Sequence, residues 1–249
     1  MKRWRLVVAG SACYLLALVA MAPAALLDPL LQRASAQRLH LADAHGTVWS
    51  GQAVLLLAER ADQGALTWPL RWHWLPGALL QGMLAIQVET APGGTPAIVA
   101  LHFDRVEIRN VDIDTPAAAL GGWLPALAPF QLGGTLRLNI DRLVWSGDDL
   151  SAQAVLRWRD ASTPYASIAP LGEYLFSFGI KRMFVKVNLQ TLSGPLRVEG
   201  HGSWRAGAAP KFQAFAQISP QQRLLLEPLL QKIEAAFPAE NFSWKFKYF

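Results

Sequence analysis

Strict alternation of apolar and polar residues dominates the chain after residue 45 and predicts β-strands. In residues 66–74 the apolar positions are Leu66, Trp68, Leu70, Trp72 and Trp74, and Thr, Pro, Arg and His lie between them. The same period of two returns in residues 151–159, 183–189, 195–205, 212–218 and 242–248. Such strands bury one face and expose the other to water, as strands of antiparallel sheets do. The pattern predicts an all-β domain over residues 45–249, built as one curved antiparallel sheet or as a thin β-sandwich.

One or two helices are expected to pack on this sheet. The clearest helix signal covers residues 220–237, which begin with a capping pattern at Ser219. Its apolar positions mark one face: Leu226, Leu230, Ile233 and Phe237. We expect this helix to cover part of the apolar face of the sheet, with Pro228 as a candidate kink. Residues 28–44 are predicted to form a helical connector, and residues 75–81 and 116–127 to form turns or single helical turns.

The first 27 residues have the pattern of a membrane anchor. Lys2, Arg3 and Arg5 precede a run without charged residues from position 6 to position 27. At about 1.5 Å per residue, a helix of this length crosses a hydrocarbon core of about 30 Å. Because basic residues stay on the cytoplasmic side, the sequence predicts a cytoplasmic tail at 1–5, a transmembrane helix at 6–27 and a main domain in the bacterial periplasm. The predicted location is therefore the inner membrane, which the chain crosses once.

A cleaved signal peptide is the alternative interpretation of this segment. Ala22, Pro23 and Ala24 have the small-x-small form of a cleavage site. The apolar stretch continues beyond them to Leu27, which favours an uncleaved anchor. The only cysteine of the sequence, Cys13, lies inside the run. The exported part therefore has no disulfide and depends on burial for its stability.

Charge and motif content argue against nucleic-acid binding and against catalysis. The formal net charge is +5 and the sequence pI is about 9.6, but no block of Lys and Arg alternates with aromatic residues, so no nucleic-acid partner is expected. The five histidines do not occur at metal-binding spacing, so neither a metal nor a cofactor is expected. The sequence also lacks a Gly-x-Ser-x-Gly elbow and a phosphate-binding glycine loop.

Asp112 and Asp114 form the best carboxylate pair of the chain, because they lie two positions apart on one face of a strand. Paired carboxylates perform acid–base chemistry when burial separates their pKa values. Thr115 and Pro116 follow directly. This context favours a solvated strand end over a catalytic site, and no catalytic residue is predicted.

Ten tryptophans are many for a chain of 249 residues. Six of them fall on the predicted apolar faces of strands: Trp68, Trp72, Trp74, Trp158, Trp204 and Trp244. They either fill a thin core or, for the first five, form an apolar binding face for a lipid or a partner protein. The sequence leaves both interpretations open.

Four stretches that follow one another along the chain carry a family resemblance. The first is residues 43–53, which include Gly46, Thr47, Val48, Trp49, Ser50 and Gly51. The second is Trp-Pro-Leu-Arg-Trp-His-Trp at 68–74, the third joins 170–174 with 193–204, and the fourth is 215–230. With the basic N-terminus and the apolar run, they cover almost the whole chain. In this order and spacing the chain resembles type II secretion system protein N, also called general secretion pathway protein N.

The resemblance implies a non-enzymatic, single-span inner-membrane component of the apparatus that exports folded proteins across the outer membrane. Its expected partners are other type II secretion components, through protein–protein contacts in the periplasm, and inner-membrane lipid, through the N-terminal helix. Within the motif, Gly46 and Gly51 are expected to shape the ends of the first strand, and Trp49 to anchor that strand in the core. The alternative is an AsmA-like periplasmic module that binds or bridges lipids on the apolar face of its sheet.

Overall fold

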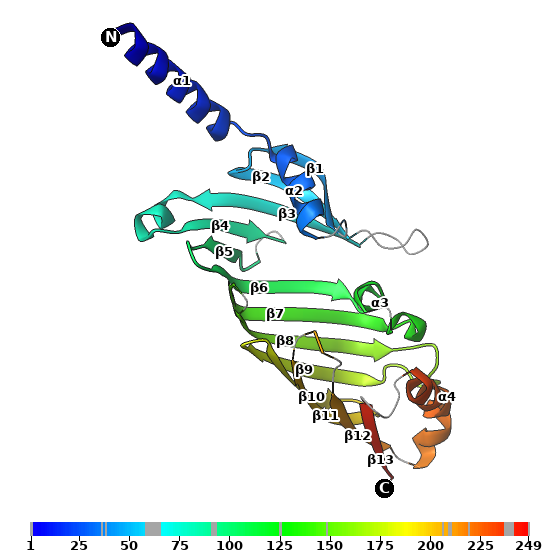
Figure 1. Cartoon of the computed structure of the whole chain (residues 1–249). Helices are drawn as coiled ribbons and strands as arrows, with labels where there is room; N and C mark the ends of the chain where they lie inside the picture. The colour runs from blue at the N-terminus through cyan, green and yellow to red at the C-terminus, as the bar shows by residue number, and fades with distance from the viewer. Residues whose placement is uncertain are drawn as a thin grey trace. The chain divides into compact units, whose positions relative to one another are not determined.

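The structure is a computed structural model of the chain, shown in Figure 1. It describes residues 2–35, 37, 39–57, 66–90, 94–124, 126–147, 149–205, 207–208, 211–218, 220–236 and 242–248. The chain forms two compact units, Met1–Ala100 and Leu101–Phe249. We call them unit 1 and unit 2 and describe each by itself.

Unit 1 combines an N-terminal helix with a β-sheet. Its helices are α1 (Lys2–Ala20), η1 (Ala24–Leu26), α2 (Leu27–Ala34) and η2 (Pro76–Gln81). Its strands are β1 (Leu39–Gly46), β2 (Ser50–Leu57), β3 (Leu66–Leu75), β4 (Leu84–Glu89) and β5 (Ala97–Leu101), and neighbours in the chain are neighbours in the sheet. The pairs β1–β2, β2–β3 and β3–β4 are antiparallel. The strand predicted for residues 66–74 is confirmed as β3, in which Trp72 is buried while Arg71 and His73 are exposed.

The helical connector predicted for residues 28–44 is wrong for its second half. Helix α2 ends at Ala34 and strand β1 begins at Leu39. The strand forms because residues 39–42 pair in register with β2, from Leu39 opposite Leu57 to Ala42 opposite Val54. Helix α2 lies beside this strand (Figure 1), and its Asp28 carboxylate accepts a hydrogen bond of 2.8 Å from the backbone N–H of Leu41. The edge of β1 is thus capped by a side chain at this position, which protects it against pairing with another strand.

We expect Asp28→Ala to loosen this edge. The N–H of Leu41 would lose its acceptor, and the free energy of unfolding of unit 1 should fall by about 1 kcal/mol. Hydrogen exchange of the Leu41 amide, followed by mass spectrometry, should become faster. Asp28→Asn retains an acceptor oxygen and serves as the control, so it should exchange nearly as slowly as the unsubstituted chain. Equal exchange rates in all three chains would contradict this role of Asp28.

Unit 2 is a larger sheet with helices on one face. Its strands are β6 (Val106–Pro116), β7 (Gly133–Ser146), β8 (Asp149–Ser162), β9 (Gly172–Lys181), β10 (Phe184–Ser193), β11 (Arg197–Arg205), β12 (Phe212–Ile218) and β13 (Phe242–Tyr248). Its helices are α3 (Ala119–Trp123), η3 (Ala128–Phe130) and α4 (Pro220–Ala236). Strands β6 to β12 follow one another in antiparallel order. Strand β13 pairs in parallel with β12, because α4 carries the chain back along the sheet between them.

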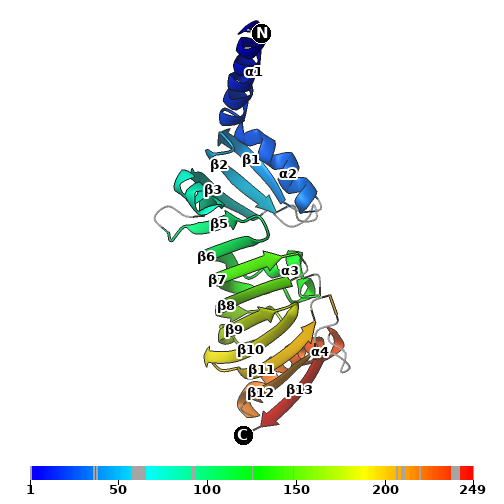
Figure 2. The same cartoon turned by 60° about the vertical axis from the view of Figure 1, so that its left-hand side comes forward.

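The core of unit 2 lies between the apolar face of the sheet and helix α4. Leu226 and Leu229 of α4 are buried in one cluster with Leu189, Val198 and Ala216 of the sheet. Figures 1 and 2 show α4 beside the last strands of the unit. The prediction of a helix that covers part of the apolar face is thereby confirmed, although Ser219 and Phe237 lie outside the described residues. Of the two predicted architectures, a sheet covered by helices matches the described residues better than a sandwich of two sheets.

The N-terminal helix α1 covers Lys2–Ala20, and η1 and α2 continue to Ala34. Within the residues that the structure describes, no helix combines the length and the apolar character needed to cross a membrane. The transmembrane helix expected at 6–27 stays a prediction from the sequence.

Candidate functional site

The motif at residues 46–51 forms the tight turn between β1 and β2. Gly46 ends β1, Gly51 lies opposite it in β2, and Gly46 has a φ of 92°, a conformation that favours glycine. The Thr47 hydroxyl accepts hydrogen bonds from the N–H groups of Trp49 (3.3 Å) and Ser50 (3.1 Å) and so closes the turn. The expectation that the two glycines shape the strand ends agrees with this geometry.

Tryptophans connect this turn to the rest of unit 1. The indole of Trp72 is buried and donates to the carbonyls of Thr47 (3.3 Å) and Val48 (3.2 Å). Trp49 is half-buried and packs against Trp74, with ring centroids 5.3 Å apart and the ring planes tilted by 50°. Its indole N–H donates to the carbonyl of Val19 in α1 at 2.8 Å. The core position expected for Trp49 is therefore occupied by Trp72, because Trp49 lies in the turn and not in the strand.

The five tryptophans proposed as an apolar binding face are divided between the two units. In unit 1, Trp72 is buried and Trp68 and Trp74 are half-buried. In unit 2, Trp158 and Trp204 are half-buried, and Trp158 packs against the core cluster. All five occupy the less exposed positions of alternating strands, as the sequence pattern indicates.

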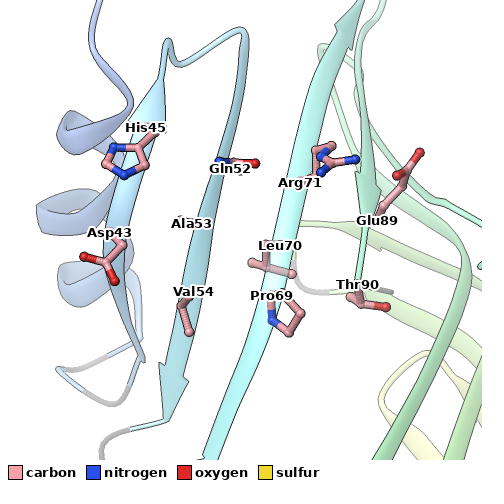
Figure 3. Close-up of a pocket in the computed structure, with 10 residues that line it drawn as sticks. All are labelled: Asp43, His45, Gln52, Ala53, Val54, Pro69, Leu70, Arg71, Glu89 and Thr90. Atoms are coloured by element: carbon pink, nitrogen blue, oxygen red, sulfur yellow. The ribbon is translucent and has the colours of Figure 1, made fainter. Parts of the chain in front are cut away.

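A shallow polar groove crosses the strands of unit 1 (Figure 3). Its volume is about 240 Å³, and its polar side chains come from four strands: Asp43, His45, Gln52, Arg71 and Glu89, with Thr90 at the end of β4. It contains both acidic and basic side chains. This mixture is typical of the water-exposed face of a sheet, and we assign no chemistry to it.

An apolar cavity of about 360 Å³ lies in unit 2. Strands β7 to β12 form its floor, and side chains of α3, η3 and α4 complete its walls. Trp158 lines it, together with aromatic residues that the sequence analysis did not single out: Phe130, Tyr174, Phe176, Phe178 and Phe212. Alternation in β9, with Tyr174, Phe176 and Phe178 two positions apart, is the signal that could have found them.

A buried carboxylate lies on β6. The Glu107 side chain is 1% exposed, and it accepts hydrogen bonds from the Nε atoms of Arg109 (2.7 Å) and Arg142. The Nε2 atom of His102 lies 3.7 Å from it. The hydrogen bond from Arg109 is the largest cause that lowers the pKa of Glu107, from 4.5 to about 2, with Arg142 adding to it against the opposing effect of burial. Glu107 is therefore ionised at neutral pH, and the cluster is an internal ion pair.

The carboxylate pair weighed as an acid–base candidate is engaged in ion pairs. Asp112 accepts hydrogen bonds from Arg137, at 2.9 Å for Nε, and from Asn139 at 2.8 Å. Asp114 lies 3.4 Å from the Arg159 guanidinium. The hydrogen bond from Arg137 lowers the pKa of Asp112. An ionised, paired Asp112 favours a role in ion pairs on the polar face of the sheet over a role in proton transfer.

The described residues thus define a β-rich protein. It has a β1–β2 turn surrounded by tryptophans, a charged face on the sheet and an apolar cavity. Among the residues that the structure describes, no group of three His, Cys, Asp or Glu side chains is placed to hold a metal ion. The family described as type II secretion system (T2SS), protein N, matches residues 37–233, and the chain belongs to this family. This confirms the resemblance seen in the sequence. No curated protein and no solved structure matches the chain.

Proposed function

We propose that the chain is a non-enzymatic inner-membrane component of the type II secretion apparatus, acting by protein–protein interaction in the periplasm. The observation that carries the proposal is the family match over residues 37–233. The ion-paired state of Asp112 and Glu107 supports a structural role, because neither carboxylate is poised to exchange a proton near neutral pH.

Contacts of residues 19–24 support an uncleaved membrane anchor. The N–H of Val48 donates to the carbonyl of Ala22 at 2.9 Å, and Pro23 forms a β-bridge with Thr47. Ala24 is buried in one cluster with Ala53 and Trp72. The candidate cleavage site is thus part of the fold of unit 1, and cleavage there would remove these contacts with the β1–β2 turn. In this proposal the basic N-terminus stays in the cytoplasm and the sheets lie in the periplasm.

The edge strands β1 and β13 differ in whether a partner protein can pair with them. The edge of β1 is capped by Asp28. Strand β13 is the last strand of unit 2, and no strand of the described residues pairs with its outer edge. An open edge of this kind accepts a strand from another protein. We therefore propose β13 as the position where another secretion component adds a strand.

An in-frame deletion in the native bacterium tests the role in secretion. We expect folded exoproteins to accumulate in the periplasm, while the outer membrane excludes a hydrophobic dye as before. Expression of the full chain from a plasmid should restore secretion, which controls for effects on neighbouring genes. Normal secretion after the deletion would overturn the proposal.

A second measurement tests the anchor. The full chain should stay in the inner-membrane fraction after carbonate extraction and retain its N-terminal peptide in mass spectrometry. Alkaline phosphatase fused behind residue 249 should be active, because that enzyme folds only outside the cytoplasm. A mature protein that begins near Ala25 would show that the segment is a cleaved signal peptide.

A further inference from the structure

The apolar cavity of unit 2 has the size and lining of a ligand site. Its volume of about 360 Å³ lies within the range of roughly 300–1,000 Å³ that is usual for small-molecule sites. Leucine, isoleucine and aromatic side chains face it from both the sheet and the helices, among them Leu136, Phe176, Leu196, Leu229 and Ile233. A site of this composition recognises its ligand by apolar contact.

The polar side-chain atoms around the cavity are already occupied. The Thr163 hydroxyl donates to the carbonyl of Phe130 at 2.6 Å. The Tyr174 hydroxyl bonds to the carbonyls of Leu196 (2.9 Å) and Leu171 (3.2 Å). The Trp158 indole donates to the carbonyl of Gly133 at 3.0 Å. Each polar side chain among the described lining residues therefore satisfies the fold itself.

Because the polar side chains of the lining already have hydrogen-bond partners, the cavity favours one of two kinds of occupant. A peptide segment would bring backbone N–H and C=O groups that need partners, and burying them without partners is unfavourable. A hydrocarbon chain brings no such groups. The lining therefore favours an acyl chain over a segment of polypeptide.

A cation of α4 lies beside the helical wall of the cavity. Lys232 follows the lining residues Leu229 and Leu230 in α4 and precedes the lining residue Ile233. Its ammonium lies 3.5 Å from the centroid of the Tyr165 ring, and Tyr165 packs against the core cluster. The N–H of Ser167 donates to the carbonyl of Leu225 at 3.0 Å, which ties the same loop to α4. The ammonium is thus held at the border between the cavity wall and the surface.

From this geometry we infer that unit 2 binds one long-chain acyl group in the cavity, with the anionic head of the lipid at Lys232. The carboxylate of a free fatty acid and the phosphate of an acidic phospholipid share this chemistry. The inference goes beyond the role in secretion and does not depend on it.

Photo-crosslinking of the full chain in its own membrane tests the site. Cells are fed a palmitic acid analogue that carries a diazirine and an alkyne, membranes are irradiated, and labelled peptides are mapped by mass spectrometry. We expect label on peptides of α4 and β9–β11, reduced by excess palmitic acid. In a second arm, lipid extracted from the purified chain is identified by mass spectrometry, and a free fatty acid or a phospholipid shows which source is used.

Two pairs of variants make the test specific. Ala216→Leu fills the cavity, whereas Ala214→Leu makes the same change in the same strand at a buried position that does not line it. Lys232→Glu reverses the charge at the wall, and Lys186→Glu makes the same reversal on the exposed face of β10. We expect Ala216→Leu and Lys232→Glu each to reduce the label about tenfold relative to their controls, as the loss of an apolar fit or of a charged contact does.

The outcomes separate clearly. Circular dichroism shows whether Ala216→Leu folds. If it does not, Lys232→Glu still tests the inferred acyl site, because Lys232 can be changed without altering the core. Label confined to α1, or label in unit 2 that neither variant reduces, would overturn the inference. So would the absence of any acyl species from the purified chain together with an unlabelled cavity. None of these results would alter the result of the deletion experiment, so the two proposals can fail separately.

Discussion

Gly46→Ala is expected to destabilise unit 1 by about 3 kcal/mol, the upper part of the range for strained backbone positions. Gly46 has a φ of 92°, and an added Cβ would lie 2.5 Å from the carbonyl oxygen of Ser50 and 2.9 Å from the Cα of Gly51. These are backbone atoms of the neighbouring strand and cannot move away without opening the turn. The substitution therefore combines an unfavourable dihedral angle with a steric clash.

The same turn has a second position without room for a side chain. A Cβ on Gly51 would lie 2.6 Å from Cζ2 of Trp72 and 2.5 Å from the carbonyl oxygen of His45. The paired glycines thus let the Trp72 indole lie across the hairpin and reach the carbonyls of Thr47 and Val48. Opening the turn at Gly46 should release these hydrogen bonds as well.

Hydrogen exchange of the β1–β2 peptides in the full chain, read by mass spectrometry, measures the effect. We expect protection of residues 39–57 to fall sharply in Gly46→Ala. Gly77→Ala is the matched control, because a Cβ there meets no atom within 4 Å and the change lies in the same unit. Protection that stays the same in both variants would show that the turn tolerates a side chain and that the glycine pair has another role.

The sequence predicts those strands whose alternation runs without interruption. In β3, in β11 and in residues 152–158 of β8, every second residue is less exposed than its neighbours, and the pattern identifies all three. β1 escaped prediction because its register shifts between Ala42 and His45, where Asp43 has a φ of 50°. Such a bulge moves the apolar positions to the other parity and destroys the period of two.

Strand β6 shows the same difficulty at another place. Its apolar positions change from even to odd numbers between Ile108 and Val111, on either side of Asn110, which has a φ of 56°. A single residue of positive φ thus breaks the period of two within a strand of eleven residues, so the pattern identifies only its second part, around Asp112 and Asp114. Helix α4 was found because its capping residues and its apolar face both lie within one short segment.

The cavity and the buried Glu107 could not be predicted from the sequence, because no local pattern shows which strands pair. The cavity unites residues from β7 to α4, whose side chains meet only once the sheet order is known. Glu107 and Arg142 are 35 positions apart and become neighbours through the β6–β7 register. The tryptophan pattern identified Trp158 as part of an apolar face, but it could not show that α4 leaves a space beside it.

Glu107→Gln is expected to lower the free energy of unfolding of unit 2 by about 2 kcal/mol at neutral pH. The side chain is 1% exposed, and the substitution removes the charge that Arg109 and Arg142 face. We expect less than a fully enclosed ion pair would contribute, because both guanidinium groups are about half-exposed and water screens them. His102 also faces the carboxylate, with its Nε2 at 3.7 Å.

The dependence on pH gives this prediction its sharpest test. The pKa of Glu107 is lowered from 4.5 to about 2 in the folded chain, so the unfolded chain binds more protons between these values. The stabilisation is therefore complete above about pH 4.5 and is lost as the pH falls towards 2. Urea unfolding of the full chain, followed across this window, should show a steep loss of stability that Glu107→Gln makes shallower. Glu199→Gln, at an exposed position of β11, is the control and should leave the slope unchanged. A slope that Glu107→Gln does not alter would mean that the carboxylate contributes no more to the folded state than an amide of the same shape.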